Sequence, residues 1–511
     1  LFAEKPVFSH AISIYDNRRE RNLSLRAGAR SRAGRFLFEN VLSSHFQFCY
    51  SESMLMPRFS CRWAGILWVA LVCLCNGCAA HQRGAVLYSP LSLLPHTTSE
   101  MRTAGFWVSR HPDSDAVILS SEEVTRFNQK IREELKLTKD LSAWPSVMSG
   151  EELRATLRKT LDDLQARGLK SLDGKKPSPA YWSGARQAMN SDAISSEIPR
   201  QYGLIVRYAD QRFLPFEEGL YAQAYDVDFD ELQNSALDIG TPVVILHRSL
   251  DGKWVWAESS TSVGWMKAKN VALATEDQVK PFWSTPFVVV TVPKGDIYLN
   301  RAMTDFYGSV LMGARLPLMR LDGDFAEVTF AQRKLDGSVE LVPGFVAAEQ
   351  VHEGYLPYTP RQVLLQAFKM LDQPYGWGGM YGAQDCSRFL QEVFAAVGIE
   401  LPRDSRNQIQ VGTRLIEWEA GAPGADKTLV LTDFAVGGIT ILGMKGHILL
   451  YLGTIDGQVY AIHSVWAYRQ PGLGKDDIFV LNRVVVSDLS LGEGSKRGSL
   501  LERLNAVKIV R

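Results

Sequence analysis

The chain has 511 residues, of which 46% are hydrophobic and 22% are charged, and its 56 basic and 56 acidic residues give a formal net charge of zero. This length predicts several domains, and the ordinary composition excludes a largely disordered chain. The balanced charge argues against nucleic-acid binding, which typically needs a basic face.

The first 53 residues precede Met54 and Met56 and contain many arginines without a periodic apolar face. We expect residues 1–53 to be an over-long gene start rather than part of the mature protein.

A short basic segment is then followed by an apolar run over residues 63–74 and by Cys78. This order resembles a lipoprotein signal peptide over residues 54–78, with cleavage before Cys78 and lipid on its sulfur. Cys75 stands where such signals usually carry a leucine. The resemblance implies a protein anchored by lipid on the periplasmic face of the cell envelope, and in a Gram-negative cell Ala79 would favour the outer membrane. A short uncleaved membrane anchor is the alternative.

The cysteine pattern follows from this signal. Only Cys78 and Cys386 remain after those at or before the signal are set aside, namely Cys49, Cys61, Cys73 and Cys75. An exported protein with these two cysteines, one of them lipidated, has no disulfide framework. A lone thiol in an oxidising compartment indicates a chemical role for Cys386.

The segment after the signal is expected to be extended and then helical. Residues 79–115 are rich in Ser, Pro and Thr and predict a tether. Capping boxes at Ser120-x-x-Glu123 and Ser149-x-x-Glu152 each precede an amphipathic run. They predict a small helical domain over residues 116–205, in which no chemistry is evident.

From about residue 206 the pattern changes to short strands and turns. Residues 243–258 resemble residues 316–327, since each has an apolar strand, an Asp-Gly turn and an aromatic strand. This internal repeat predicts two small SH3-like β-barrels over residues 206–280 and 281–354. Such barrels usually bind peptides or cell-wall polymer, although a fold does not define a function.

The stretch from Tyr375 to Phe389 is the most informative part of the chain. A glycine-rich loop ends at Asp385-Cys386-Ser387, and an amphipathic helical pattern follows at once and stops at Gly398. The first turn of a helix carries unpaired amide groups and a positive dipole, which favour a thiolate. Cys386 is therefore a candidate nucleophile, and the alternative is a small buried hydrophobic residue.

Two histidines downstream complete a candidate site. His447 and His463 lie in or next to two apolar strands joined by an Asp456-Gly457 turn. A thiol protease needs a thiolate, an imidazole and a polar group that orients the imidazole, and Cys386, His447 and His463 can fill these roles. A histidine on an apolar strand is more often a core residue. A zinc site is not expected, because these residues supply too few ligands.

Residues 359–475 resemble the NlpC/p60 family of cysteine peptidases. The residues that carry this resemblance are Tyr375, Trp377-Gly378-Gly379, Asp385-Cys386-Ser387, Leu401-Pro402-Arg403, Ser405, Gly446-His447 and Ala461-Ile462-His463-Ser464. The resemblance implies an α+β, papain-like catalytic domain over residues 355–511, in a multidomain chain with a helical domain and two SH3-like domains upstream. It implies a thiol endopeptidase that cleaves peptidoglycan stem peptides, commonly between γ-D-glutamate and the diamino acid.

The same resemblance implies the roles of individual residues. Cys386 attacks the γ-glutamyl carbonyl, His447 protonates the leaving amine and His463 orients His447. Asp385 and Ser387 match positions that bind the free amine of an N-terminal L-alanine in relatives with this architecture. The remaining candidate substrate contacts are Tyr375, Trp377, Arg403, Ser405 and Arg388, and the last of these stands where many members have glycine.

Two alternatives stay open at this stage. An N-acetylmuramoyl-L-alanine amidase would use related thiol chemistry, and a wall-binding lipoprotein would keep only a relict site. In every case we expect a monomer that needs no cofactor or metal, binds peptidoglycan or its fragments and does not bind nucleic acid.

Overall fold

The computed structural model describes residues 86–88, 93–419 and 421–511. These residues belong to one compact unit of the chain. The predicted signal peptide and the predicted lipidation at Cys78 lie outside the described residues. Within the described ranges, no helix combines the length and the apolar character that crossing a membrane requires.

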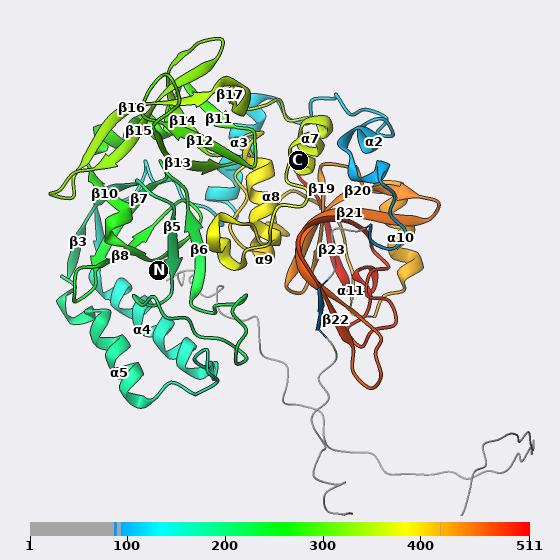
Figure 1. The fold of residues 1–511 in the computed structure, drawn as a ribbon, viewed down its shortest axis with the longest axis horizontal. Coiled ribbons are helices and arrows are strands. Elements are labelled where there is room, and N and C mark those ends of the chain that lie inside the picture. Colours follow the sequence, from blue (N-terminus) through cyan, green and yellow to red (C-terminus); the bar gives the residue numbers. More distant parts are fainter. Residues whose placement is uncertain (1–85, 89–92, 420) are drawn as a thin grey trace, which may run out of the picture. The chain divides into compact units, whose positions relative to one another are not determined.

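The C-terminal part of the chain forms a seven-stranded sheet in the order β1-β22-β21-β20-β19-β23-β18 (Figure 1). Its strands are β1 (Val86–Tyr88), β18 (Thr413–Glu417), β19 (Thr440–Met444), β20 (His447–Ile455), β21 (Gln458–Gln470), β22 (Asp477–Asp488) and β23 (Leu504–Ile509). β1 pairs with β22 in parallel, whereas the other pairs are antiparallel.

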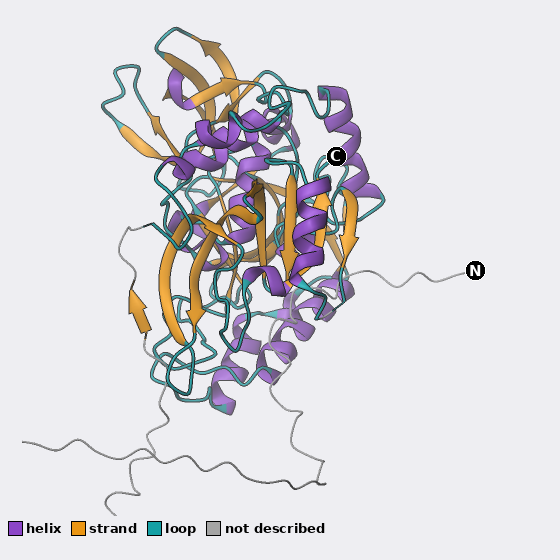
Figure 2. Cartoon of the chain, turned by 90° about the vertical axis from the view of Figure 1, so that its right-hand side faces the viewer, coloured by secondary structure: helices purple, strands orange, loops and turns teal. Residues whose placement is uncertain are grey.

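Helices cover both faces of this sheet, and Figure 2 shows its strands with helices packed against them. Successive residues of β20 enter different cores, since Ile448 packs in one cluster and Leu449 in another. The first cluster contains residues of α7 (Pro360–Lys369) and α8 (Cys386–Ala395), and the second contains a leucine of α10 (Gly424–Phe434). Because successive side chains of a strand point to opposite faces, both faces of this sheet are buried.

Two further seven-stranded sheets precede the C-terminal one. The first sheet has the order β10-β4-β7-β8-β9-β5-β6, and its strands are β4 (Gln201–Ile205), β5 (Ala209–Arg212), β6 (Gln233–Leu237), β7 (Pro242–Arg248), β8 (Trp254–Glu258), β9 (Val263–Lys267) and β10 (Val271–Ala274). The second sheet has the order β13-β12-β16-β15-β14-β11-β17, and its strands are β11 (Phe287–Val290), β12 (Lys294–Tyr298), β13 (Phe306–Leu311), β14 (Arg315–Leu321), β15 (Phe325–Arg333), β16 (Val339–Ala347) and β17 (Val351–Glu353).

The internal repeat corresponds to equivalent hairpins of these two sheets. Residues 243–258 form β7 and β8, and residues 316–327 form parts of β14 and β15. Each hairpin is antiparallel and carries a register shift. That the second sheet is an SH3-like barrel stays a prediction.

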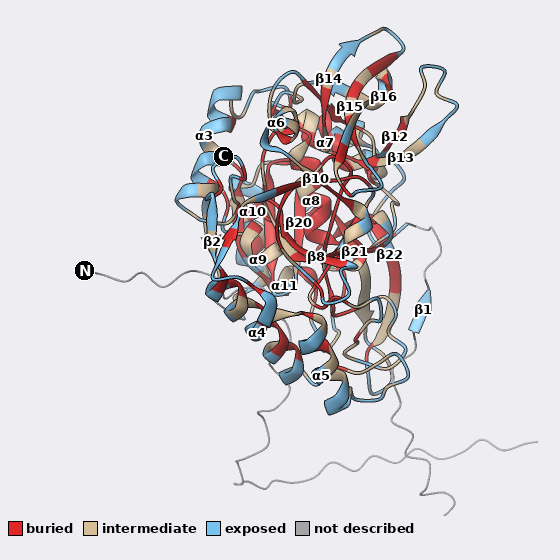
Figure 3. Cartoon of the chain, turned by 90° about the vertical axis from the view of Figure 1, so that its left-hand side faces the viewer, coloured by how far each residue is buried: buried red, intermediate tan, exposed pale blue. Residues whose placement is uncertain are grey.

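The helices expected near the start are present, but they pack on different parts of the molecule. α3 (Ser121–Glu133) has the full capping box of Ser120 and Glu123, so that prediction is confirmed, and its Ile131 packs in the core of the C-terminal sheet. α4 (Gly150–Ala166) and α5 (Pro179–Ala188) pack with the first sheet and keep exposed outer faces (Figure 3). The span predicted as one helical domain is thus divided between two cores.

Part of the predicted tether is also packed. α2 (Ala104–Val108) contacts α7, and Trp107 lies in the core of the C-terminal sheet with its indole N–H donating to the Met101 carbonyl oxygen at 2.8 Å. Met101, Trp107 and Val108 of the predicted tether therefore lie in the core of the C-terminal sheet, because an indole of this size stabilises the fold when it is buried.

Further short elements include β2 (Val147–Ser149), β3 (Glu197–Pro199), α6 (Glu276–Val279), α9 (Ser405–Gln408), α11 (Leu500–Arg503) and the 3₁₀ segment η6 (Trp377–Gly382). β2 and β3 pair with each other, and η6 leads into α8.

Candidate active site

The glycine-rich loop brings the candidate nucleophile to the start of α8. Gly378 and Gly379 have φ values of 62° and 86°, a region in which only glycine is unstrained. A Cβ on Gly378 would lie 2.6 Å from Cγ of Gln233 in β6, so the first sheet approaches this loop closely. The helix then begins at Cys386, as the sequence indicates.

Cys386 is buried, with 9% of its surface exposed. Burial, and then the adjacent Asp385 carboxylate, raise the pKa of its thiol to about 12, although the Ile448 backbone amide opposes this by donating a hydrogen bond. Desolvation is thus the largest influence on this thiol, and it disfavours the thiolate. The Ile448 contact also places the sulfur beside the first residues of β20.

The two histidines form a chain of hydrogen bonds with a serine. His447 Nε2 lies 2.7 Å from His463 Nδ1, and His463 Nε2 lies 3.0 Å from Ser487 Oγ. If each ring donates from Nε2, His447 Nδ1 is left as the acceptor for a proton from Cys386. His463 and Ser487 are both fully buried, so neither can exchange these partners for water.

Both imidazoles are neutral at ordinary pH. Burial lowers the pKa of His463 to about 3. Burial also holds the pKa of His447 well below its usual value, and the electrostatic influence of His463, Arg503 and Arg497 lowers it further. A proton transfer from the Cys386 thiol to the His447 imidazole would therefore be needed to form a thiolate and an imidazolium.

Ser487 is a site residue that the sequence reasoning missed. It lies on β22, where Val485 pairs with His463 and Ser487 pairs with Ala461. The only local signal is a hydroxyl at the end of the apolar run from Val484 to Val486. Its contact with His463 can be recognised only from the register of β21 and β22.

Asp385 is enclosed by donors from its own loop and from the next one. Its Oδ1 accepts hydrogen bonds from the Arg388 amide at 2.8 Å and from the Ser387 hydroxyl at 2.9 Å. Its Oδ2 accepts from the Gly378 amide at 3.1 Å and from the Arg403 guanidinium at 2.7 Å.

These partners decide the charge of Asp385. Burial alone would raise the pKa of this carboxyl, but the Arg403 charge and the hydrogen bonds hold it below its usual value. Asp385 is therefore an ionised N-cap of α8 with its own counter-charge, and its binding of a substrate amine stays a prediction.

Arg388 lies in the contact between α8 and the first sheet and does not line an open groove. Its Nε donates to Glu392 at 2.7 Å, and its Nη1 donates to the Ala236 carbonyl oxygen at 2.5 Å. The i, i+4 spacing to Glu392 directs the side chain along the helix and away from Cys386. Only 6% of Arg388 is exposed, so its predicted contact with substrate finds no support in this placement.

Aromatic side chains join the glycine-rich loop before α8 to a long loop of the first sheet. The Phe229 ring packs at 5.3 Å from Trp377, 5.1 Å from Trp466 and 6.2 Å from Tyr375, measured between ring centroids. The Trp377 indole donates to the Asp230 carbonyl oxygen at 3.1 Å. Tyr375 and Trp377, both predicted site residues, therefore take part in this aromatic contact with the first sheet.

The loop after α8 is held against it by Arg403 and Gln408. Besides Asp385, Arg403 binds the Ser387 hydroxyl at 3.0 Å, and Gln408 Nε2 donates to the Ser387 carbonyl oxygen at 2.7 Å. Ser405 is the first residue of α9 and is partly exposed. The structure thus brings Arg403 to Asp385 and Ser387, whereas Ser405 makes no side-chain hydrogen bond that ties it to them among the described contacts.

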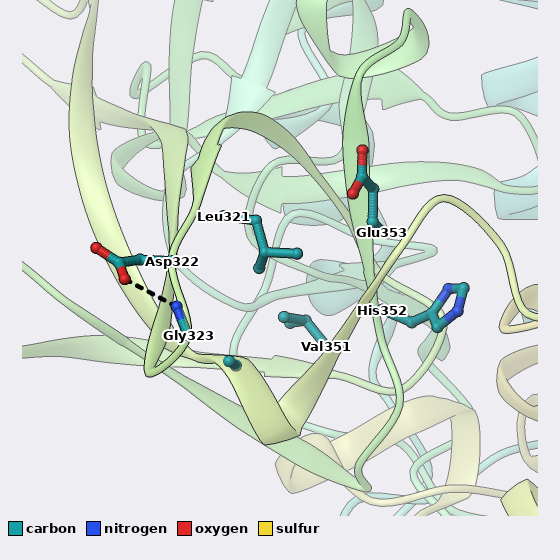
Figure 4. Close-up of a pocket in the computed structure, with 7 residues that line it drawn as sticks. Leu321, Asp322, Gly323, Val351, His352 and Glu353 are labelled. Atoms are coloured by element: carbon teal, nitrogen blue, oxygen red, sulfur yellow. Dashed lines mark hydrogen bonds between the residues drawn. The ribbon is translucent and has the colours of Figure 1, made fainter.

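A shallow pocket on the second sheet contains none of the predicted site residues. Figure 4 shows its lining, in which Asp322 Oδ1 accepts a hydrogen bond from the Gly323 amide at 2.8 Å. The labelled lining residues are Leu321, Asp322, Gly323, Val351, His352 and Glu353.

The geometry places a buried thiol at the start of α8 beside the strand that begins with His447, and comparison with known proteins shows which families the chain resembles. Residues 372–465 match the NlpC/P60 family, and residues 220–267 match an SH3 domain of the SH3b1 type. The chain therefore contains an NlpC/P60 family domain and an SH3b domain. The predicted resemblance of the catalytic domain and the SH3-like nature of the first sheet are confirmed to this extent.

Two curated relatives have the same name, gamma-D-glutamyl-L-lysine dipeptidyl-peptidase. The protein from Bacillus cereus is 29% identical over 214 residues, which cover 40% of this chain and 57% of the relative. The protein from Bacillus subtilis is 28% identical over 152 residues, which cover 29% of this chain and 46% of the relative. The chain thus spans about half the length of the curated relatives that it matches.

A solved structure described as a novel NlpC/P60 endopeptidase from Photobacterium damselae subsp. piscicida covers a larger part of the chain. It has a TM-score of 0.67 at 18% identity, and the match covers 83% of this chain and 99% of that one. At this identity the likeness concerns the fold alone.

Proposed function

We propose that this protein is a peptidoglycan hydrolase, a cysteine peptidase that uses Cys386, His447 and His463. The observation that carries the proposal is the thiol at the start of α8 beside the first residues of β20, with His447 hydrogen-bonded to His463 at 2.7 Å. The NlpC/P60 match over residues 372–465 supports the same reading.

The chemistry is acyl transfer in two steps. Cys386 attacks a peptide carbonyl while its proton passes to His447, and the backbone N–H of Cys386 stabilises the oxyanion at the helix start. His447 then gives the proton to the departing amine, and water releases the acyl group. Because burial disfavours the free thiolate, we propose that the proton transfer accompanies the attack.

The bond we propose is the one between γ-D-glutamate and the diamino acid of a stem peptide. The shared name of the two Bacillus relatives supports this choice. Digestion of purified peptidoglycan followed by mass spectrometry tests it, since cleavage there exposes a new α-amine on the diamino acid. A new amine on L-alanine would instead identify a muramoyl-L-alanine amidase.

We further propose that the protein acts as a monomer on the periplasmic face of the envelope, held by lipid on Cys78. The signal-like segment before Cys78 supports this location. Cys78→Ser should leave the protein unlipidated and release it from the membrane fraction. Unchanged membrane partitioning of that variant would contradict the lipid anchor.

A further inference from the structure

The hairpin of β21 and β22 ends in a turn that carries a fully exposed leucine. The last residue of β21, Gln470, pairs with Asp477 at the start of β22, so the turn comprises residues 471–476. Leu473 lies near the middle of this turn and is 100% exposed. A single exposed leucine is ordinary on a protein surface, so its meaning depends on what surrounds it.

The turn is held in a defined shape. A Cβ on Gly472 would lie 2.4 Å from the Lys475 carbonyl oxygen, and Gly474 has a φ of 85°, so this tight turn needs both glycines. The loop after β22 supports the turn, since Lys496 Nζ donates to the Gly474 carbonyl oxygen at 2.6 Å. Leu473 is therefore presented to solvent by a structured turn and does not fold back on the sheet.

Further exposed apolar side chains lie beside this hairpin. All three residues of β1 (Val86–Tyr88) are apolar or aromatic and exposed, although they pair with β22 (Figure 3). Leu87 of β1 pairs with Phe479, and the partly exposed Phe479 ring stacks on Tyr468 of β21 at 5.4 Å between centroids. Exposed apolar groups that gather in this way are typical of a surface that docks on a protein or a membrane.

The direction of β1 shows what lies on the side of the turn. β1 is parallel to β22 and places Val86 opposite Ile478, the second residue of β22, so the chain enters β1 from the side of the turn. Cys78 precedes Val86 by only eight positions. Eight fully extended residues span at most about 28 Å. A lipid on Cys78 would therefore hold the bilayer close to the turn, on the side toward which the turn points.

The side chains of the turn suit the surface of a bilayer. A leucine partitions into the acyl boundary, and a tyrosine ring favours the headgroup layer. Lys475 and Lys496 are exposed beside Leu473 and match the negative charge of anionic phospholipids. The acidic residue of the turn, Asp476, is buried and accepts the Lys496 amide at 3.0 Å with each of its carboxylate oxygens, so it does not face the bilayer.

We infer that the turn of residues 471–476 is a membrane-docking site, which inserts Leu473 into the bilayer that holds the lipid of Cys78. This inference rests on the proposed lipid anchor, and it adds that the anchored protein takes one orientation on the membrane. His463 lies earlier on β21, the strand that leads to the turn. Docking of the turn therefore sets the distance of the catalytic centre from the bilayer.

The first test compares the modification of two lysines by a charged, water-soluble amine reagent, followed by mass spectrometry. The lipidated full chain is bound to vesicles of phosphatidylethanolamine and phosphatidylglycerol, and Cys78→Ser is measured in solution. Lys475, next to Leu473, should react severalfold more slowly on the vesicles. Lys334 is the matched control, because it is exposed next to Leu335, which is fully exposed in the β15–β16 hairpin, and its rate should not change.

Two variants of the lipidated chain complete this test. Leu473→Asp should restore the reaction of Lys475 on vesicles, and Leu335→Asp should leave Lys475 protected. Both variants should keep the wild-type kcat/KM on a soluble stem peptide, since neither leucine belongs to the catalytic centre. A lipidated protein whose Lys475 reacts as fast on vesicles as in solution would overturn the docking site and leave the anchor and the peptidase intact. Failure of the anchor itself is seen separately, as unchanged membrane partitioning of Cys78→Ser.

A second test measures the depth of the turn directly. A nitroxide is attached to Leu473→Cys or to Leu335→Cys in the lipidated chain, each combined with Cys386→Ala to remove the competing thiol. On vesicles, the accessibility of the label at position 473 to oxygen should rise severalfold relative to its accessibility to a water-soluble nickel chelate. The label at position 335 should show no such rise. A label at position 473 that stays as accessible to the chelate as the one at position 335 would overturn the inference.

Discussion

Ser487 is predicted to position the catalytic histidines, and Ser487→Ala tests this role. In the structure the Ser487 hydroxyl is the partner of His463 Nε2 at 3.0 Å, and both residues are fully buried. Removal of the hydroxyl leaves a buried ring nitrogen without a partner, which costs about 1–3 kcal/mol. If the whole cost is added to the activation free energy through a misoriented His463 ring, kcat should decrease roughly 5- to 150-fold, since 1.36 kcal/mol is tenfold in rate.

The assay is steady-state hydrolysis of a stem peptide over a range of pH. A positioning role predicts a lower kcat, a nearly unchanged KM and a shifted acid limb of the pH profile, because His463 no longer holds one tautomer. Ser487→Thr should restore most of the activity, since threonine keeps the hydroxyl.

Ser259→Ala is the control for a purely structural effect. Ser259 is buried in the first sheet and its hydroxyl donates to the Ser262 carbonyl oxygen at 3.1 Å, far along the chain from the catalytic residues. Both alanine variants should lower the melting temperature, but only Ser487→Ala should lower kcat. A Ser487→Ala enzyme with wild-type kcat and pH profile would refute the reasoning.

Three further predictions follow from the site. Asp385→Asn should weaken hydrolysis of peptides with a free N-terminal alanine more than hydrolysis of N-acylated ones, and equal effects in a kinetic comparison would favour its capping role alone. Because the pKa of His463 falls from its ordinary value near 6.5 to about 3 on folding, the unfolded state binds more protons between these pH values. The free energy of unfolding should therefore decrease as pH falls through this window, and urea unfolding should show a smaller decrease for His463→Gln. Gly378→Ala should lose more activity and stability than Gly354→Ala, because both glycines have positive φ but only Gly378 has a neighbour where the new Cβ would lie.

The sequence predicts the local elements around the candidate catalytic residues well because their signals are local. Asp385, Cys386 and the amphipathic run after them describe a capped helix without reference to the rest of the chain, and α8 begins at Cys386. The strands that contain His447 and His463 are also local patterns, joined by an Asp-Gly turn. Register then brings the two rings together.

The features that the sequence analysis missed depend on contacts between distant segments. The Ser487 hydroxyl reaches His463 Nε2 only because of the register of β21 and β22. Arg388 turns toward Ala236 because the first sheet packs on α8. These two residues are 152 positions apart in the chain, so the sequence around Arg388 does not reveal the contact. Trp107 belongs to the predicted tether but lies in the core of the C-terminal sheet. Burial of its large indole stabilises the fold, although the residues around it in the sequence are largely polar.

The most direct test of the account is the digestion of purified peptidoglycan by the wild-type protein and by Cys386→Ala, with the products identified by mass spectrometry. We expect the wild-type protein to release fragments that end in γ-D-glutamate and to expose the α-amine of the diamino acid, and Cys386→Ala to release almost none. Cleavage by Cys386→Ala at the wild-type rate, or no cleavage of any stem-peptide bond by the wild-type protein, would contradict a cysteine peptidase centred on Cys386.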